Sequence, residues 1–403
     1  MKFESVKIAD LISEISMGPF GSNIKVECFV DDGIPVLNGS NLEGYALKED
    51  SFRYVTEEKA DSLGKANAYR GDVVITHRGT LGQIVFIPQN SKYNRYVISQ
   101  SQFRVKCNER LLPEYLVYYF HTRIGQYKLL SNSSQVGVPA LARASTTFQM
   151  IEIEVPEIKT QRKIVGLLES IRQKIVINNE INNNLLQQAQ ALFISWFVDY
   201  EPFGGIIPDD WKDISVYDLA DYINGAAFKK NEYSDTGLPI IKISELKNGI
   251  TDSTQRCCVT KDDKYYIDDR DILFSWSGNP DTSIDAFIWS MGRAILNQHT
   301  FRVVSKYDAP AFTFFLLKYL KPQFTHIASN KQTTGLGHVT VADLKRMQFR
   351  ANAGTIAEFN SITMPMFDLI YSNYKEIQQL SVLRDTLLPQ LMSGELDVST
   401  IDF

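Results

Sequence analysis

The chain has 403 residues, 44% hydrophobic and 22% charged, so it is long enough for two or three domains with buried cores. No apolar run approaches the roughly 18 residues of a membrane-spanning helix. We also expect no signal peptide, and the four cysteines form neither a disulfide framework nor a zinc-binding pattern. These features predict a protein of the cytoplasm, without contact to a membrane.

The net charge of −5 hides an alternating pattern along the chain. Residues 1–64 carry 6 Lys/Arg and 12 Asp/Glu, a net of −6, whereas residues 65–143 carry 11 and 3, a net of +8. Residues 201–292 then carry 9 and 17, a net of −8, and residues 293–350 carry 9 and 2, a net of +7. An acidic stretch followed twice by a basic stretch indicates two similar units, each with an electropositive region suited to a polyanion.

Short segments of the first half recur in the second half in the same order, with an offset that drifts only from 204 to 197 residues. This regularity indicates a duplicated domain whose loops differ in length. The matching pairs are Gly33–Leu37 and Gly237–Ile241, Gly71–Thr76 and Arg270–Ser275, Val97–Gln100 and Ile295–Gln298, Phe103–Val105 and Phe301–Val303, and Pro113 and Pro310.

Each copy contains short β-branched and aromatic runs separated by Gly, Asn, Pro and Asp, which is typical of strands joined by loops. Apolar spacing predicts that a helix follows the strands in each copy. We assign residues 1–158 to the first domain and residues 204–354 to the second. The predicted strands are Val73–Ile75, Ile84–Ile87, Phe103–Val105, Ile240–Ile243, Ile272–Phe274 and Phe301–Val304, and the helices are Glu114–Leu130 and Ala309–Leu320.

A long helical segment follows each domain, residues 159–203 and residues 355–403. From Thr160 to about Tyr200 there is no proline, and apolar residues recur at three- and four-residue steps. From Pro365 to Leu391 a seven-residue apolar repeat is present. Such spacing is typical of paired helices, and forty helical residues span about 60 Å. Asn178 and Asn373 fall on these helices and could fix the register of the pair, or could simply lie on the solvated face.

The predicted fold is therefore α+β (mixed α/β): two similar globular domains, each followed by a long helix, with the two helices paired as an antiparallel coiled-coil spacer. No phosphate-binding loop is present, and the five histidines are scattered without metal-ligand spacing. The tetrad Asn279–Thr282 lacks the second proline and the aromatic residue of a methyltransferase motif. We expect the chain to be non-catalytic and to bind no metal or cofactor itself.

Polar loops at corresponding places of the two basic regions are candidates for DNA binding, because Arg, Gln, Asn and Thr can hydrogen-bond or contact base edges. Lys and Ser also bind phosphate. The alternative is that these loops are ordinary turns. The candidate residues are His77, Arg78, Thr80, Gln83, Asn132, Ser134, Gln135 and Arg143 in the first domain, and Trp276, Ser277, Asn279, Lys331, Gln332, Thr333, Thr334 and His338 in the second.

The helical segments carry the motifs of a known family. Glu376–Leu396 (EIQQLSVLRDTLLPQLMSGEL) closely resembles the C-terminal conserved segment of type I restriction–modification specificity subunits. Gln161–Leu168, together with Ala191–Val198, resembles the central conserved segment of that family. Ile207–Trp211 and Gly18–Ser22 resemble the openings of its two target recognition domains.

The resemblance implies a specificity subunit of a bacterial defence complex that recognises a bipartite double-stranded DNA site. It further implies two modification subunits that use S-adenosylmethionine to methylate adenine, and restriction subunits that use ATP and Mg²⁺ to translocate and cleave DNA. The partners would dock on apolar residues exposed on the helices, unless those residues fill the junctions with the domains. The docking candidates are Leu167, Phe193, Phe197 and Leu388.

Two other functions are consistent with a duplicated chain in which acidic and basic stretches alternate. A free-standing DNA-binding regulator would bind DNA tightly without partners, but the net charge of −5 counts against it. A protein-interaction scaffold would use its basic regions to contact acidic proteins instead of DNA. A gel shift of the isolated chain tests the regulator, and co-purification with a methyltransferase tests the scaffold.

Overall fold

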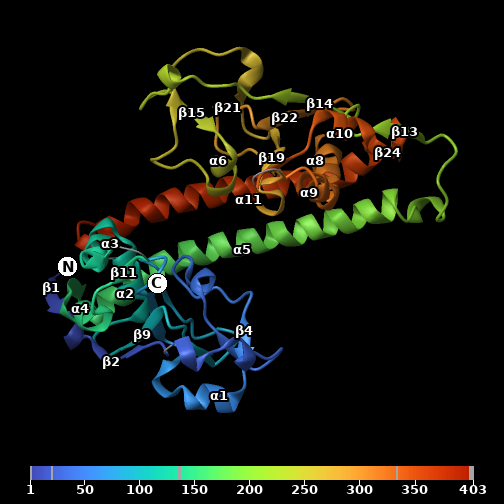
Figure 1. Ribbon diagram of the computed structural model, residues 1–403. Helices are drawn as coiled ribbons and strands as arrows, with labels where there is room; N and C mark the ends of the chain where they lie inside the picture. Colours follow the sequence, from blue (N-terminus) through green and yellow to red (C-terminus); the bar gives the residue numbers. More distant parts are fainter. Residues whose placement is uncertain (1, 20, 135–137, 333–334, 399–403) are drawn as a thin grey trace. The chain divides into compact units, whose positions relative to one another are not determined.

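The computed structural model describes residues 2–19, 21–134, 138–332 and 335–398. It contains two compact units, which we call unit 1 (Met1–Arg172 with Val382–Phe403) and unit 2 (Gln173–Ser381). The division falls within two long helices, α5 (Ile158–Phe197) and α11 (Ala353–Ser393), each drawn as one continuous ribbon in Figure 1. Among the described residues, no helix combines the length and the apolarity needed to cross a membrane.

Unit 1 contains two four-stranded sheets. The first has the order β2-β9-β6-β7 and is antiparallel throughout. All five residues of β6 are buried, because Val73 and Ile75 pack in the main core of the unit while Val74 packs in a second core on the other face. The strands of this sheet are β2 (Ile12–Met17), β9 (Gln102–Cys107), β6 (Asp72–Thr76) and β7 (Ile84–Phe86).

The second sheet of unit 1 has the order β4-β3-β8-β5, with β3 and β8 parallel. A separate pair, β1 with β12, joins the two ends of the domain's chain. The remaining elements of unit 1 are β4 (Arg53–Val55), β3 (Ile34–Val36), β8 (Arg95–Val97), β5 (Asn67–Tyr69), β1 (Phe3–Lys7), β12 (Glu152–Pro156), β10 (Ser133–Ser134), β11 (Ala140–Leu141), α1 (Glu57–Ser62), α2 (Pro113–His121), α3 (Arg123–Leu130) and α4 (Ala144–Met150).

Unit 2 repeats this topology, which confirms the predicted duplication and the mixed α/β class. Its sheets have the orders β14-β22-β18-β20 and β16-β15-β21-β17, again with one parallel pair, β15 with β21. The elements are β14 (Ala220–Asn224), β22 (Thr300–Ser305), β18 (Ile272–Ser275), β20 (Asp285–Ile288), β16 (Arg256–Cys257), β15 (Leu238–Ile241), β21 (Ala294–Leu296), β17 (Tyr266–Ile267), β13 (Lys212–Ser215), β24 (Gln348–Ala351), β19 (Ser277–Gly278), β23 (Gly337–His338), α6 (Ile243–Asn248), α7 (Pro280–Ser283), α8 (Pro310–Tyr319), α9 (Lys321–Ser329) and α10 (Val341–Arg346).

The predicted helix Glu114–Leu130 is wrong as a single helix, because the chain breaks into α2 and α3 at Thr122. Thr122 is extended, and its hydroxyl oxygen accepts a hydrogen bond from the Gly125 N–H (3.0 Å), so it caps α3. A Cβ at Gly125 would lie 2.1 Å from the Tyr119 carbonyl oxygen. The break therefore depends on the close approach of α3 to the end of α2.

One other predicted bound is corrected, because Ile243 begins α6 and is not part of the preceding strand, which ends at Ile241. The last helix, α11, begins at Ala353, two residues before the predicted helical segment 355–403. The Asn352 side chain accepts a hydrogen bond from the Thr355 N–H (2.7 Å) and caps its first turn. The other long helix, predicted between Thr160 and about Tyr200, is confirmed as α5.

A buried polar layer joins α5 and α11 within unit 2. Asn178, Asn182 and Asn373 are each at most 6% exposed. The Asn373 side-chain amide donates to Asn182 Oδ1 (2.8 Å), and the Asn178 amide donates to Glu376 Oε2 (2.7 Å). Residue 178 of α5 bonds residue 376 of α11, and residue 182 bonds residue 373, so the two helical segments run antiparallel. Asn178 and Asn373 thus lie in the helix pair and not on a solvated face, although each bonds a different partner.

We predict that Asn373→Ala lowers the free energy of unfolding by about 1–3 kcal/mol, because it removes the hydrogen bond to Asn182 in a buried site. Replacing Asn182 and Asn373 together by leucine is expected to restore most of that stability, since no buried amide then lacks its partner. Urea unfolding of the full chain with both variants measures this. An Asn373→Ala chain as stable as the wild type would contradict a structural role for the layer.

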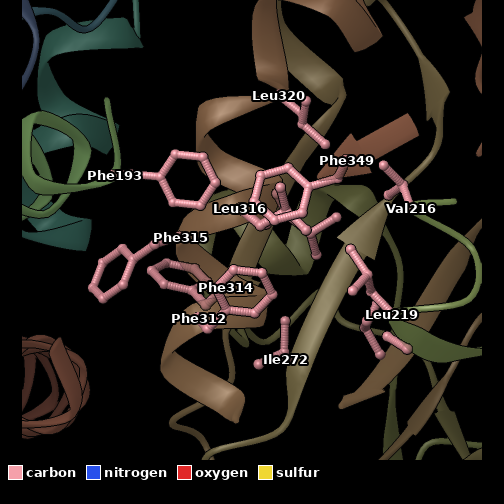
Figure 2. Packing of buried hydrophobic residues seen from close by; sticks show 14 of the residues in the cluster. Phe193, Val216, Leu219, Ile272, Phe312, Phe314, Phe315, Leu316, Leu320 and Phe349 are labelled. Carbon is pink, nitrogen blue, oxygen red and sulfur yellow. The ribbon is translucent and has the colours of Figure 1, made fainter. Parts of the chain in front are cut away.

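The main core of unit 2 encloses the end of α5. Figure 2 shows the Phe193 ring directed toward the side chains of α8, among them Leu316 and Phe312, with Phe349 of β24 beside them. Phe193 is completely buried, and its ring centroid lies 4.7 Å from that of Tyr319 and 5.7 Å from that of Phe349. The end of α5 is therefore an integral part of this domain's core.

Candidate nucleic-acid interface

In unit 1, the loop after β6 and the hairpin β10–β11 are hydrogen-bonded to each other. The Leu141 N–H donates to the His77 carbonyl (2.9 Å), and the Gly79 N–H donates to the Pro139 carbonyl (2.9 Å). Gly79 has a φ of +92°, which a residue with a side chain rarely adopts. The structure thus brings the predicted residues of loop 77–83 next to those of the hairpin, although they are far apart in the sequence.

Unit 2 makes the equivalent contact. Strand β19 pairs with β23, so that Ser277 lies opposite His338, and the Val339 N–H donates to the Trp276 carbonyl (2.8 Å). In both units, the residues that follow the buried strand β6 or β18 are held against a segment from the end of the domain. The two halves of each predicted recognition surface therefore form one continuous site.

Several of the predicted side chains are hydrogen-bonded within the protein. Thr76 Oγ1 donates to Gln83 Oε1 (3.1 Å), and Gln83 Nε2 donates to the Gly39 carbonyl (3.0 Å). Asn279 Oδ1 accepts from the N–H groups of Asp281 and Thr282 and caps α7. These amides stabilise the loops that carry the exposed candidates.

Lys331 also has an internal partner, because its ammonium group pairs with the buried Asp343 carboxylate. Burial disfavours the charge on Asp343, but the hydrogen bonds from Lys331 and Thr340 outweigh it and lower the pKa of the carboxyl group. The Gln332 amide, on the exposed side of this loop, donates to the Gly335 carbonyl (3.1 Å).

The exposed candidates of unit 1 are Arg78, Thr80, Asn132, Ser134 and Arg143. Neither arginine forms an ion pair with another of the described residues, so both guanidinium groups are available to a ligand. The remaining candidates Gln135, Thr333 and Thr334 lie outside the described residues.

His77 contributes a neutral ring to this surface. Burial lowers the pKa of His77, and its Nε2 lies 3.1 Å from the Gln100 carbonyl oxygen. The ordinary pKa is about 6.5, so a lowered value leaves the ring uncharged at neutral pH. In unit 2 the corresponding position holds Trp276, whose ring centroid lies 5.8 Å from that of His299. Arg78, the next residue in the chain, therefore supplies positive charge beside His77.

A hollow of about 600 Å³ on unit 1 lies beside the loop, and Gly18, Pro19, Lys65, His77, Arg78 and Gln100 are among the residues that line it. Gln100 was not among the predicted site residues, and neither was its counterpart Gln298. The signal was present in the sequence, because both glutamines end matching repeat segments.

The predicted docking residues are not exposed, which corrects that hypothesis. Phe193 and Phe197 lie in the core of unit 2, Leu388 lies in the core of unit 1, and Leu167 packs half-buried against that same core. Three- and four-residue spacing identifies an apolar stripe on a helix but not what covers it. The exposed apolar side chains of the two helices are Val176, Ile177, Ile181, Ile362, Leu369, Val382 and Leu383.

No set of three His, Cys, Asp or Glu residues in the described part of the chain could hold a metal ion. The predicted recognition surfaces instead consist of amides, hydroxyls and guanidinium groups on loops anchored to sheets. Such groups bind through hydrogen bonds and charge, which suits base edges and phosphates.

Comparison with known proteins gives one consistent result. The specificity subunit of the type I restriction enzyme MjaIX from Methanocaldococcus jannaschii is 24% identical over an alignment of 418 positions, which covers 98% of this chain and 94% of that protein. The HindI specificity subunit from Haemophilus influenzae is 21% identical over an alignment of 407 positions, which covers 81% of this chain and 87% of that protein.

Similarity in structure extends over the same length. A crystal structure of the S subunit of a type I restriction–modification system from M. genitalium matches with a TM-score of 0.56 and 14% identity, and covers 99% of this chain and 97% of that one. The family described as "Type I restriction modification DNA specificity domain" matches residues 2–187 and 208–350. The chain belongs to this family of type I restriction–modification specificity proteins and carries two copies of its domain.

Proposed function

We propose that each domain of this specificity subunit reads one half of a bipartite sequence in double-stranded DNA. The observation that carries the proposal is the contact present in both copies, which joins the loop after β6 or β18 to a late segment of the same domain. It places exposed polar side chains on a rigid base twice, within the two basic segments, residues 65–143 and 293–350. Positive charge favours approach to phosphates, and polar loops can read base edges.

The long helices serve as the spacer that sets the gap between the two half-sites. Support comes from the continuity of α5 and α11 and from the buried asparagine layer that fixes their antiparallel register in unit 2. A helix rises about 1.5 Å per residue, so a fixed register gives a fixed length. Specificity then consists of two short half-sites and one gap.

Two modification subunits dock on exposed apolar side chains of α5 and α11, such as Ile181 and Ile362 in unit 2. Those partners use S-adenosylmethionine to methylate adenine, and restriction subunits use ATP and Mg²⁺ to translocate and cleave DNA. This chain supplies recognition and binds no cofactor itself. Apolar side chains exposed on a long helix favour a partner surface over solvent.

To test assembly, this chain is co-expressed with the modification subunit of the same restriction–modification system and purified through a tag on this chain. We expect a complex with two modification subunits per chain that binds its target duplex at 0.15 M salt. The isolated chain, with its net charge of −5, is expected to bind weakly. Tight sequence-specific binding by the isolated chain would instead indicate a free-standing regulator, and a chain that recruits no methyltransferase would contradict the proposal.

We predict that Arg78→Ala weakens recognition in the half-site read by unit 1. If Arg78 bridges guanine O6 and N7, discrimination at one base pair falls by about 1–3 kcal/mol. Competition binding of the assembled complex with duplexes altered at single positions measures this. A uniform loss of affinity for all duplexes, with a smaller salt dependence, would identify Arg78 as a phosphate contact instead.

A further inference from the structure

Each domain presents a glutamine on the same tight turn. In unit 1, the Gln102 N–H donates to the Ser99 carbonyl (3.0 Å) and closes a turn whose second residue is Gln100. In unit 2, the Thr300 N–H donates to the Asn297 carbonyl (3.1 Å), and the second residue of that turn is Gln298. Each turn leads directly into an inner strand of the first sheet, β9 or β22, so it is anchored to a rigid element.

The backbone of each turn packs closely against a glycine from another segment of the same domain. A Cβ at Gly18 would lie 1.9 Å from the Ser99 carbonyl oxygen, and a Cβ at Gly225 would lie 2.2 Å from the Asn297 carbonyl oxygen. The Gly18 N–H donates to the Gln102 carbonyl (2.8 Å), and the Gly225 N–H makes the matching bond to Thr300 (3.1 Å). No other residue fits at either place, so both copies need a glycine to hold the turn in position.

The two glutamine side chains are exposed, and hydrogen bonds to the described residues do not explain their presence. The Gln100 amide makes no hydrogen bond to any other described residue, and Gln298 Nε2 makes one long contact, 3.4 Å from His299 Nε2. Gln100 lines the hollow beside His77 and Arg78. A primary amide on a fixed backbone can bridge the N6 and N7 atoms of adenine with one donor and one acceptor.

We infer that Gln100 and Gln298 are specificity-determining residues, each reading an adenine in the half-site of its own domain. The inference deepens the proposed function and rests on it, because it names the side chains that read bases on the two proposed surfaces. It makes a prediction that separates the domains: a change at one glutamine alters one half-site and leaves the other intact.

The test uses the complex of the full chain with its modification subunits. The target sequence is first determined with the wild-type complex, and methylation is then measured on duplexes in which each specified base pair is changed in turn. We expect Gln100→Ala to reduce discrimination at one A·T pair of one half-site by between about 5-fold and about 150-fold. Gln298→Ala is expected to do the same in the other half-site, so each variant is the control for the other.

A second pair of variants keeps the size of the side chain. Gln100→Glu and Gln298→Glu remove the amide donor but leave an acceptor, so acceptance of a C·G pair should rise at the same position. The exposed residues Gln89 and Gln323 provide matched controls, and their alanine variants should retain the wild-type sequence preference.

The outcomes separate the inference from the proposed function. A wild-type complex that discriminates in both half-sites, with Gln100 and Gln298 variants of unchanged preference, would overturn the inference alone. An equal loss at every position in both half-sites would also overturn it, because it would mark a backbone contact. A wild-type complex without any sequence preference would overturn both.

Discussion

Phe193→Ala is expected to destabilise unit 2 by about 3–5 kcal/mol, the usual cost of removing a fully buried phenylalanine. The ring is completely buried, and it contacts the rings of Phe197, Phe312, Tyr319 and Phe349. Loss of the ring would leave a cavity at the place where α5 joins the core, and the packed surroundings could close it only in part. Urea unfolding of the purified chain, followed by tryptophan fluorescence, measures the change.

The matched comparison is Ile181→Asp, on the same helix but 38% exposed. This variant should keep the wild-type stability and lose the modification subunits on co-purification, since a charge replaces an exposed apolar contact. Phe193→Leu should lie between wild type and Phe193→Ala in stability. If Phe193→Ala were as stable as the wild type but failed to assemble, Phe193 would be a docking residue and its place in the core would be of no energetic importance.

Matched removal of seven residues from each long helix is expected to change the gap that the complex accepts and to leave both half-sites unchanged. Deletion of residues 173–179 and residues 375–381 removes Asn178 together with its partner Glu376, and retains the bond between Asn182 and Asn373. Seven residues are close to two helical turns, so the remaining residues keep nearly the same face, and about 10 Å of helix is lost.

The readout is methylation of duplexes that carry the same two half-sites with gaps of different length. A shorter preferred gap is expected, because the rise of B-DNA is about 3.4 Å per base pair. Deletion of residues 173–179 alone serves as a control, since it shifts α5 against α11 and should lower stability. A change in the half-site sequences themselves would show that the helices contribute to base reading and are not a spacer.

Much of the architecture could be predicted from the sequence because it depends on local patterns. The buried run Val73–Ile75 and its repeat Ile272–Phe274 identify the central strands, and the lack of proline after Thr160 identifies α5. The duplicated segments predicted a duplicated sheet topology, which both units share. Periodicity and repetition are properties of the chain alone, so no tertiary information was needed.

The failures concern features that apolar spacing does not report. The break at Thr122 depends on the close packing of Gly125 against Tyr119 and on the Thr122 cap, and apolar spacing alone reveals neither. Phe193 and Phe197 lie on a helix with more than one apolar face, and only the fold shows that the domain core covers them. The sequence shows Gln100 and Gln298 at the ends of repeated segments, but only the structure shows that they are exposed and that a glycine packs against each turn.

We propose that one chain recognises two separate pieces of duplex DNA for a methyltransferase. Genome-wide detection of methylated adenine, in otherwise identical cells that carry or lack the gene, tests it most directly. We expect a methylated sequence of two specified parts, separated by a constant number of unspecified bases, only in cells with the gene. Methylation of one uninterrupted sequence, or a two-part pattern that persists without the gene, would contradict it.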